Sequence, residues 1–297
     1  MRGITIAWWS GGVTSAVACK MALDLYENVR VVMLDTMNEH EDTYRFKDDC
    51  EKWYGVKIEV YKHPGFNSIQ EVWRKYNSLA SATGAICSTE LKANARQLYC
   101  KGKDIEAHVF GFEYHPKEIN RAENWEKNKG LKAHFPLIDN KIDKLAAMNT
   151  LRLNGIEIPV VYSYGFNNNN CFKTGCTQGG IGYWQKIKDD FPEKYEAMAT
   201  MEHELSRAKG RPVVICQDQR GERAITKWDI SKRTGQPTTK SKLFLKHNDD
   251  FPEVPTIDVI KGKHKAIIDS FECNGFCGLE KDENQLDFLE LFNEAGE

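Results

Sequence analysis

Apolar runs alternate with amphipathic segments through the first 60 residues, and this alternation constrains the fold more than any other feature of the chain. The run 3–9 (GITIAWW) predicts a buried strand, and after two glycines apolar residues recur every four positions, as on one face of a helix. A β-branched run at 29–34, a polar helix at 41–54 and a strand at 56–61 follow. This βαβαβ series predicts an α/β fold with an open, mostly parallel twisted sheet and helices on both faces.

Later segments extend the sheet and then change character. Residues 107–112 predict another strand, and 133–138 predict a short edge strand, because Pro136 cannot donate to a central ladder. About five strands are expected. The pattern becomes loop-rich and cysteine-containing after residue 160, so we expect a nucleotide-binding domain at 1–160 and a smaller region at 161–297 that completes the site.

The region after residue 160 contains three further predicted elements. A polar helix is expected at 193–209 and a strand at 211–216. The segment 231–246 holds five basic residues, no acidic one and several turn formers, so it predicts an exposed loop.

Bulk composition gives no sign of a nucleic-acid-binding, membrane-spanning or secreted protein. With 41 Lys and Arg against 43 Asp and Glu, the net charge of -2 does not demand nucleic acid or an anionic membrane as a partner. No window approaches the ~18 apolar residues that span a bilayer, and the first residues lack the features of a secretion signal. A cytoplasmic location is therefore expected. Nine cysteines, an odd number, then favour metal, cluster or catalytic roles over disulfides.

The strongest local signal is the hexapeptide Ser10-Gly11-Gly12-Val13-Thr14-Ser15 between the first strand and helix. The glycines let the backbone approach a ligand, the helix N-terminus adds positive potential, and the hydroxyls can donate hydrogen bonds. These features predict a phosphate site at Ser10, Gly11, Gly12, Thr14 and Ser15. The alternative is a plain glycine turn with a capped helix.

Several motifs occur in the order found in a known family. SGGVTS resembles the PP-loop of the ATP pyrophosphatase superfamily. The other motifs resemble those of phosphoadenosine phosphosulfate (PAPS) reductases, and they are LDTMNEHEDTYRF (34–46), CSTELK (87–92), GFEYHPKEINRA (111–122), FPL (135–137) and the segment from Ile158 to Thr177. The chain is thereby identified as a member of the PAPS reductase family, over roughly residues 5–185.

The resemblance implies an adenine-nucleotide site for ATP or an adenylyl-sulfate nucleotide. Asp35 and Thr36 would meet the ribose or adenine, although Asp35 as the cap of the next turn is an equal alternative. Gly111 belongs to the same site, and Lys92 and Arg121 would face the anionic groups of the ligand. The intact glycine pair favours ATP.

With ATP as the ligand, Mg²⁺ is a candidate companion of the nucleotide. Thr14, however, stands where a PP-loop usually has an acidic residue.

The cysteines suggest a second centre. In family members that hold a [4Fe-4S] cluster the resemblance predicts four cysteine positions, and three of them map here, at Cys87, Cys171 and Cys176. Zn²⁺ fits the spacings about as well as iron–sulfur, and free loop thiols are the alternative. Near the C-terminus, the run Cys277-Gly278-Leu279 resembles a family segment whose cysteine is the nucleophile toward sulfur, and Glu272 beside Cys273 makes Cys273 a second candidate. Either cysteine could complete a sulfur site.

The leading hypothesis is an enzyme of sulfur or adenylyl transfer. It would cleave ATP to AMP and pyrophosphate with an adenylated acceptor, or reduce sulfate with a thiol or sulfur-donor protein as partner. One alternative is a component of tRNA or DNA sulfur modification, in which the basic loop from Lys232 to Lys246 contacts phosphates. Another is a nucleotide-binding regulator without catalysis. The sequence predicts no oligomeric state.

Overall fold

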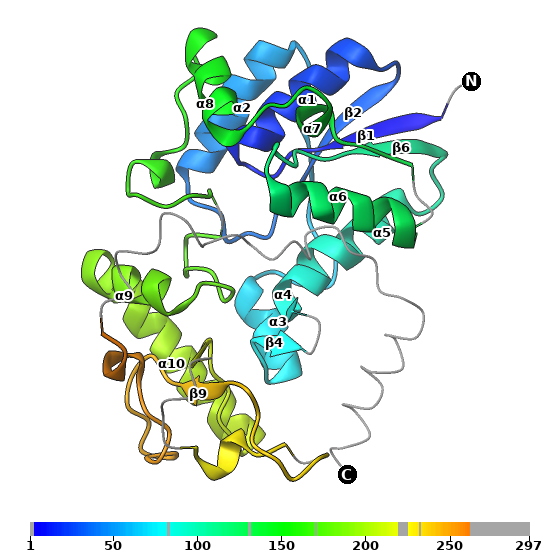
Figure 1. The fold of residues 1–297 in the computed structure, drawn as a ribbon. Coiled ribbons are helices and arrows are strands. Elements are labelled where there is room, and N and C mark those ends of the chain that lie inside the picture. The colour runs from blue at the N-terminus through cyan, green and yellow to red at the C-terminus, as the bar shows by residue number, and fades with distance from the viewer. Residues whose placement is uncertain are drawn as a thin grey trace.

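The computed structural model describes residues 3–81, 84–129, 132–169, 171–218, 225–231 and 233–261 (Figure 1). The central feature is a five-stranded sheet in which every neighbouring pair of strands is parallel. The strands in spatial order are β3 (Glu59–Tyr61), β2 (Val29–Leu34), β1 (Ile4–Trp8), β6 (Ile105–Val109) and β7 (Ala133–His134). The predicted parallel sheet of about five strands is confirmed.

Helices cover both faces of the sheet, as expected for strands buried on two sides (Figure 1). One face carries α1 (Val13–Leu25), α2 (Asp42–Tyr54), α7 (Pro136–Asp139) and α8 (Lys144–Leu153). The other carries α5 (Ala95–Cys100) and α6 (Pro116–Lys129). Alternate strand residues separate the two cores, since Ala7 packs with the first group and Ile6 with the second.

Local sequence signals explain where two of these elements begin and end. Gly55 ends α2 in the left-handed conformation, with φ of 72°. The predicted edge strand 133–138 is too long, because only Ala133–His134 pair with β6 and Pro136 begins α7. A proline has no backbone N–H and a fixed φ, so it suits the first turn of a helix better than a strand.

A second core lies beside the sheet and joins two stretches that are far apart in sequence. The first stretch contains α3 (Ile69–Tyr76), the hairpin of β4 (Ala80–Ser81) and β5 (Gly84–Ala85), α4 (Ile86–Ser88) and the π-helix η1 (Thr89–Asn94). The later stretch contains η2 (Val160–Tyr162), α9 (Ile181–Asp190), α10 (Pro192–Lys209), β8 (Cys216–Asp218), η3 (Lys227–Asp229), β9 (Ser241–Leu243) and η4 (Ile257–Val259). Side chains from both stretches form one buried cluster.

Two predictions for the later stretch need correction. The strand expected at 211–216 begins only at Cys216, where β8 pairs with β9 in antiparallel fashion. The loop expected at 231–246 is exposed only in part, because Leu243, Phe244 and Leu245 are fully buried. These three apolar side chains belong to the core. The gain from burying them outweighs the preference of the preceding turn formers and charged residues for an exposed loop. No helix in the described part of the chain has both the length and the apolar composition to cross a bilayer.

A buried carboxyl group fixes this second region. The side chain of Glu202 on α10 is fully buried, and its two oxygens accept hydrogen bonds from the backbone N–H groups of Ile215 and Leu245, each at 2.7 Å. Burial raises the pKa of Glu202 from 4.5 to about 8, although the two backbone bonds oppose this shift.

The raised pKa predicts a pH-dependent contribution to stability. Between pH 4.5 and 8 the folded chain binds a proton at Glu202 that the unfolded chain does not, so this group's contribution falls as the pH rises. Glu202→Gln should destabilise the fold by about 1–3 kcal/mol, because an amide nitrogen would face a backbone N–H. The difference from wild type in urea unfolding should shrink between pH 5 and pH 8. The exposed Glu193→Gln on α10 is the control, and an unchanged difference for Glu202→Gln would contradict the assignment.

Candidate nucleotide site

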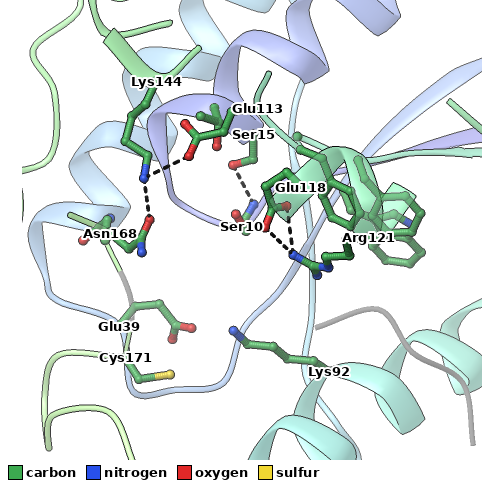
Figure 2. A pocket seen from close by; sticks show the side chains of 16 residues that line it. Ser10, Ser15, Glu39, Lys92, Glu113, Glu118, Arg121, Lys144, Asn168 and Cys171 are labelled. Carbon is green, nitrogen blue, oxygen red and sulfur yellow. Dashed lines mark hydrogen bonds and ion pairs between the residues drawn. The ribbon is translucent and has the colours of Figure 1, made fainter. Parts of the chain in front are cut away.

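The connections of the sheet diverge between β1 and β6, because the chain runs from β1 to β2 and β3 on one side and later enters β6 on the other. Open parallel sheets bind ligands at such a point, beyond the C-terminal ends of the strands. An open cavity of about 170 Å³ lies there (Figure 2). Its lining comprises Trp8, Ser10, Thr14, Ser15, Glu39, Lys92, Phe110, Gly111, Phe112, Glu113, Glu118, Arg121, Lys144, Asn168, Asn169 and Cys171.

The predicted phosphate loop forms one wall of this cavity. Gly11 adopts φ of 84°, a left-handed conformation, and Gly12 precedes the first turn of α1. The Ser15 hydroxyl accepts from the N–H of Ser10 at 3.0 Å (Figure 2). It also donates to the carbonyl of Gly12 at 2.8 Å. Ser15 thus stabilises the turn, whereas the hydroxyls were predicted as donors to phosphate.

Gly111, in the chain after β6, lies directly against this loop. A Cβ at this position would lie 2.5 Å from Ser15 Cα and 2.6 Å from Ser15 N, which is closer than real contacts allow. Only glycine therefore permits the chain after β6 to pass this close to the start of α1. The order of motifs predicted Gly111 as a site residue, and the close approach gives the physical reason for a glycine there.

Two residues that sequence reasoning missed hold the loop from behind. The side-chain nitrogen of Asn169 donates to the Gly11 carbonyl at 2.8 Å and to the Thr43 hydroxyl at 2.9 Å. The Tyr162 hydroxyl accepts from the N–H of Val13 at 3.2 Å. The four consecutive asparagines at 167–170 were interpreted only as a loop signal, and Tyr162 only as part of a motif, so neither contact was expected.

Charged side chains of both signs surround the cavity. Arg121 pairs with Glu118 at 3.1 Å, and its guanidinium lies 3.9 Å from the centre of the Phe112 ring. Lys144 contacts Glu113 at 3.3 Å and donates to Asn168 Oδ1 at 3.1 Å. Sequence reasoning predicted Lys92 and Arg121 and included Glu118 in the same motif, but it missed Lys144 and Glu113.

Lys92 extends toward Glu39 and Cys171 (Figure 2). Glu39 is buried, and its oxygens accept from the Thr36 hydroxyl at 2.7 Å and from the Asn38 N–H at 3.0 Å. Burial, together with the nearby Asp35, raises the pKa of Glu39 to about 7. The carboxyl group beside Lys92 therefore titrates near neutral pH, which no sequence motif indicated.

Asp35 and Thr36 do not line the cavity that contains the phosphate loop. The Asp35 carboxylate accepts from the Met37 N–H at 2.7 Å and from the Tyr44 hydroxyl at 2.9 Å. Burial favours a higher pKa for Asp35, but its hydrogen bonds with Glu39, Met37 and Tyr44 together hold that pKa below its ordinary value. These bonds match the turn-cap alternative, and a contact of Asp35 with the nucleotide stays a prediction.

The three cysteines predicted as metal ligands do converge. Cys87, Cys171 and Cys176 line a second, smaller cavity of about 20 Å³, and Thr36 and Lys92 also line it. Burial raises the pKa of all three thiols, that of Cys171 to about 11. Cys171 lies 3.5 Å from the Thr36 hydroxyl, and Lys92 and Cys171 line both cavities.

Among the described residues, however, no group of three or more His, Cys, Asp or Glu side chains is arranged to hold a metal ion. Ligation of a cluster or zinc by Cys87, Cys171 and Cys176 therefore stays a prediction. Cys273 and Cys277, the predicted nucleophiles, lie outside the described residues.

The sequence profile of the phosphoadenosine phosphosulfate reductase domain matches residues 5–174, more than half of the chain. The chain belongs to this family. The solved structures similar to this PAPS reductase family protein include the phosphoadenylyl-sulfate (PAPS) reductase from Candida auris in complex with phosphate. That match has a TM-score of 0.44 and 17% identity, and it covers 56% of this chain and 80% of the other. A comparison with curated proteins gave no match.

Proposed function

We propose that this PAPS reductase family protein is an enzyme that binds an adenine nucleotide, ATP or an adenylyl-sulfate nucleotide, and transfers its adenylyl or sulfur group. The observation that carries the proposal is the glycine loop at the start of α1, which lies in a cavity at the point where the strand connections diverge. Several polar and charged side chains converge on this open cavity, as is common in ligand sites.

In this proposal the phosphate or sulfate groups lie against Ser10, Thr14 and the first N–H groups of α1, where the helix dipole favours anions. Lys92 and Arg121 supply positive charge from the opposite walls. Fixed charges of this kind stabilise the negative charge that develops during transfer of a phosphoryl or related group. The apolar surface of Trp8, Phe110 and Phe112 provides a place for the nucleoside.

The position of Lys92 supports transfer to or from sulfur. Lys92 and Cys171 belong to both cavities, so a reacting phosphorus or sulfur atom beside Lys92 would face the cysteines. A small π-helix carries Lys92, and π-helices occur often at functional sites. The thiols are predominantly neutral at pH 7, because burial raises their pKa, so the proposal gives them no role as nucleophiles in this form.

The two substrate classes are separable in one set of measurements. Calorimetry should show ATP and adenosine phosphosulfate competing for one site, and Lys92→Ala should weaken binding by on the order of tenfold, the loss expected for one charge-assisted contact. Pyrophosphate release would assign the ATP reaction, and thiol-dependent release of sulfite the reductive one. Binding without either product would support a regulator. A folded protein that binds no adenine nucleotide would refute the proposal.

A further inference from the structure

Two oxygen acceptors in the walls of the nucleotide cavity have no hydrogen-bond partner among the described residues. They are Oδ1 of Asn169 and Oε2 of Glu113. Asn169 is only 5% exposed, and a polar atom buried without a partner is rare in folded proteins. We therefore expect both oxygens to contact a hydrogen-bond donor or a cation that belongs to a ligand.

The orientation of Asn169 is fixed by its other contacts. Its side-chain nitrogen lies 2.8 Å from the Gly11 carbonyl, which can only accept, so the amide cannot be turned around. Its oxygen is therefore the atom that has no partner in the described part of the chain. The Glu113 side chain is held in a similar way, because its Oε1 lies 3.3 Å from Lys144 Nζ. Its Oε2 has no hydrogen-bond partner among the described residues.

Tyr162 connects the two acceptors to the phosphate loop. The backbone of Asn169 hydrogen-bonds the Tyr162 hydroxyl, and the charge of Glu113 contributes to the raised pKa of the same hydroxyl, after the larger effect of burial. That hydroxyl also accepts from the N–H of Val13 in the first turn of α1. Both acceptors thus lie near the helix N-terminus at which the phosphates are proposed to bind.

A bare phosphate would meet unfavourable charges there. Three cations, Lys92, Arg121 and Lys144, line the cavity, but so do three carboxyl groups, those of Glu39, Glu113 and Glu118. A polyanion would place its oxygens near Glu113 and near the unpaired oxygen of Asn169. A small divalent cation would satisfy both acceptors and the phosphates, because Mg²⁺ prefers oxygen ligands and commonly uses one or two carboxylates together with substrate phosphates and water.

We propose that the nucleotide binds as its complex with a divalent cation, Mg²⁺ in the first place, and that Glu113 and Asn169 accept from this cation or from its bound water. This inference rests on the proposed nucleotide site and adds the ionic form of the ligand. It also assigns roles to two residues that no motif indicated. Neither role needs the acidic residue that Thr14 replaces in the loop.

Calorimetric titration with ATP tests this, first in excess Mg²⁺ and then in EDTA. Wild type should bind roughly 10- to 100-fold more tightly with Mg²⁺, the usual effect of residues that support a metal. In Glu113→Gln, which preserves shape, this difference should largely disappear, whereas the affinity in EDTA should be equal or higher because a negative charge is removed. Glu106→Gln, on the exposed side of β6, is the matched control and should behave as wild type.

Mn²⁺ provides a readout that is independent of affinity. The electron paramagnetic resonance spectrum of Mn²⁺–ATP should broaden when wild-type protein is added, and less so with Glu113→Gln. Asn169→Ala should weaken ATP in both conditions, since the Gly11 carbonyl loses its donor, and should also lose the Mg²⁺ effect.

Equal affinity of wild type in Mg²⁺ and EDTA, or a full Mg²⁺ effect in Glu113→Gln, would overturn the cation inference while the nucleotide site stands. No binding of ATP in either condition would overturn both.

Discussion

Gly11→Asp is expected to abolish nucleotide binding in a protein that still folds. A side chain at this position begins 2.8 Å from Thr43 Cγ2 and 3.5 Å from Asn169 Nδ2, so it must displace the contacts that hold the loop. The φ of 84° also disfavours most side chains. The new carboxylate would add negative charge where phosphates are proposed to bind. A loss on the order of 100-fold in ATP affinity, equivalent to about 2.8 kcal/mol, should be measurable by calorimetry.

A second glycine separates backbone strain from the effect on the site. Gly55 has a similar φ of 72°, but a Cβ there would meet nothing within 4 Å, and the residue ends α2 outside the cavity lining. Gly55→Asp should therefore lose only the stability that backbone strain costs and keep its ATP affinity. If folded Gly11→Asp bound ATP as wild type does, the loop would not be the phosphate site.

The sequence predicted the fold where the signal is local. The strand, the two glycines and the four-residue apolar spacing before Leu25 describe β1, the loop and α1, because each depends on residues close in sequence. Contacts such as that between Asn169 and Gly11 join residues 158 positions apart. An asparagine run carries no sign of such a partner, since asparagine is also the common residue of exposed turns.

The sequence also does not show which of its charged residues belong to the site. Motif order selected Lys92 and Arg121, and both line the cavity. Glu39, Glu113 and Lys144 appear in the sequence as ordinary polar positions, because a charged residue on a loop or helix is usually solvated. Only the packing of the chain shows that Glu39 is buried and that its pKa is raised. The charge balance of the cavity is therefore a property of the fold.

Gly111→Ala is expected to give the largest loss of stability. The added methyl group would lie 2.5 Å from Ser15 Cα and 2.6 Å from Ser15 N, and both are backbone atoms at the start of a buried helix. Flexible side chains can move aside, but these atoms can move only if α1 shifts away from the end of β6. Overpacking of this kind typically costs 1–3 kcal/mol, and a loss of about 3 kcal/mol or more is expected here because no side chain can yield.

Urea unfolding measures this loss, with Gly180→Ala as the matched control. A Cβ at Gly180 meets nothing within 4 Å, and this residue only precedes α9, so the control should lose less than about 1 kcal/mol. Gly111→Ala should also bind ATP more weakly, since the shift of α1 moves the loop that it begins. A variant that is as stable as wild type and binds ATP equally well would mean that the chain after β6 does not contact α1 at this point. A stable variant with impaired binding would instead mean that the helix moves easily, so that the closeness of Gly111 to Ser15 serves the site rather than the fold.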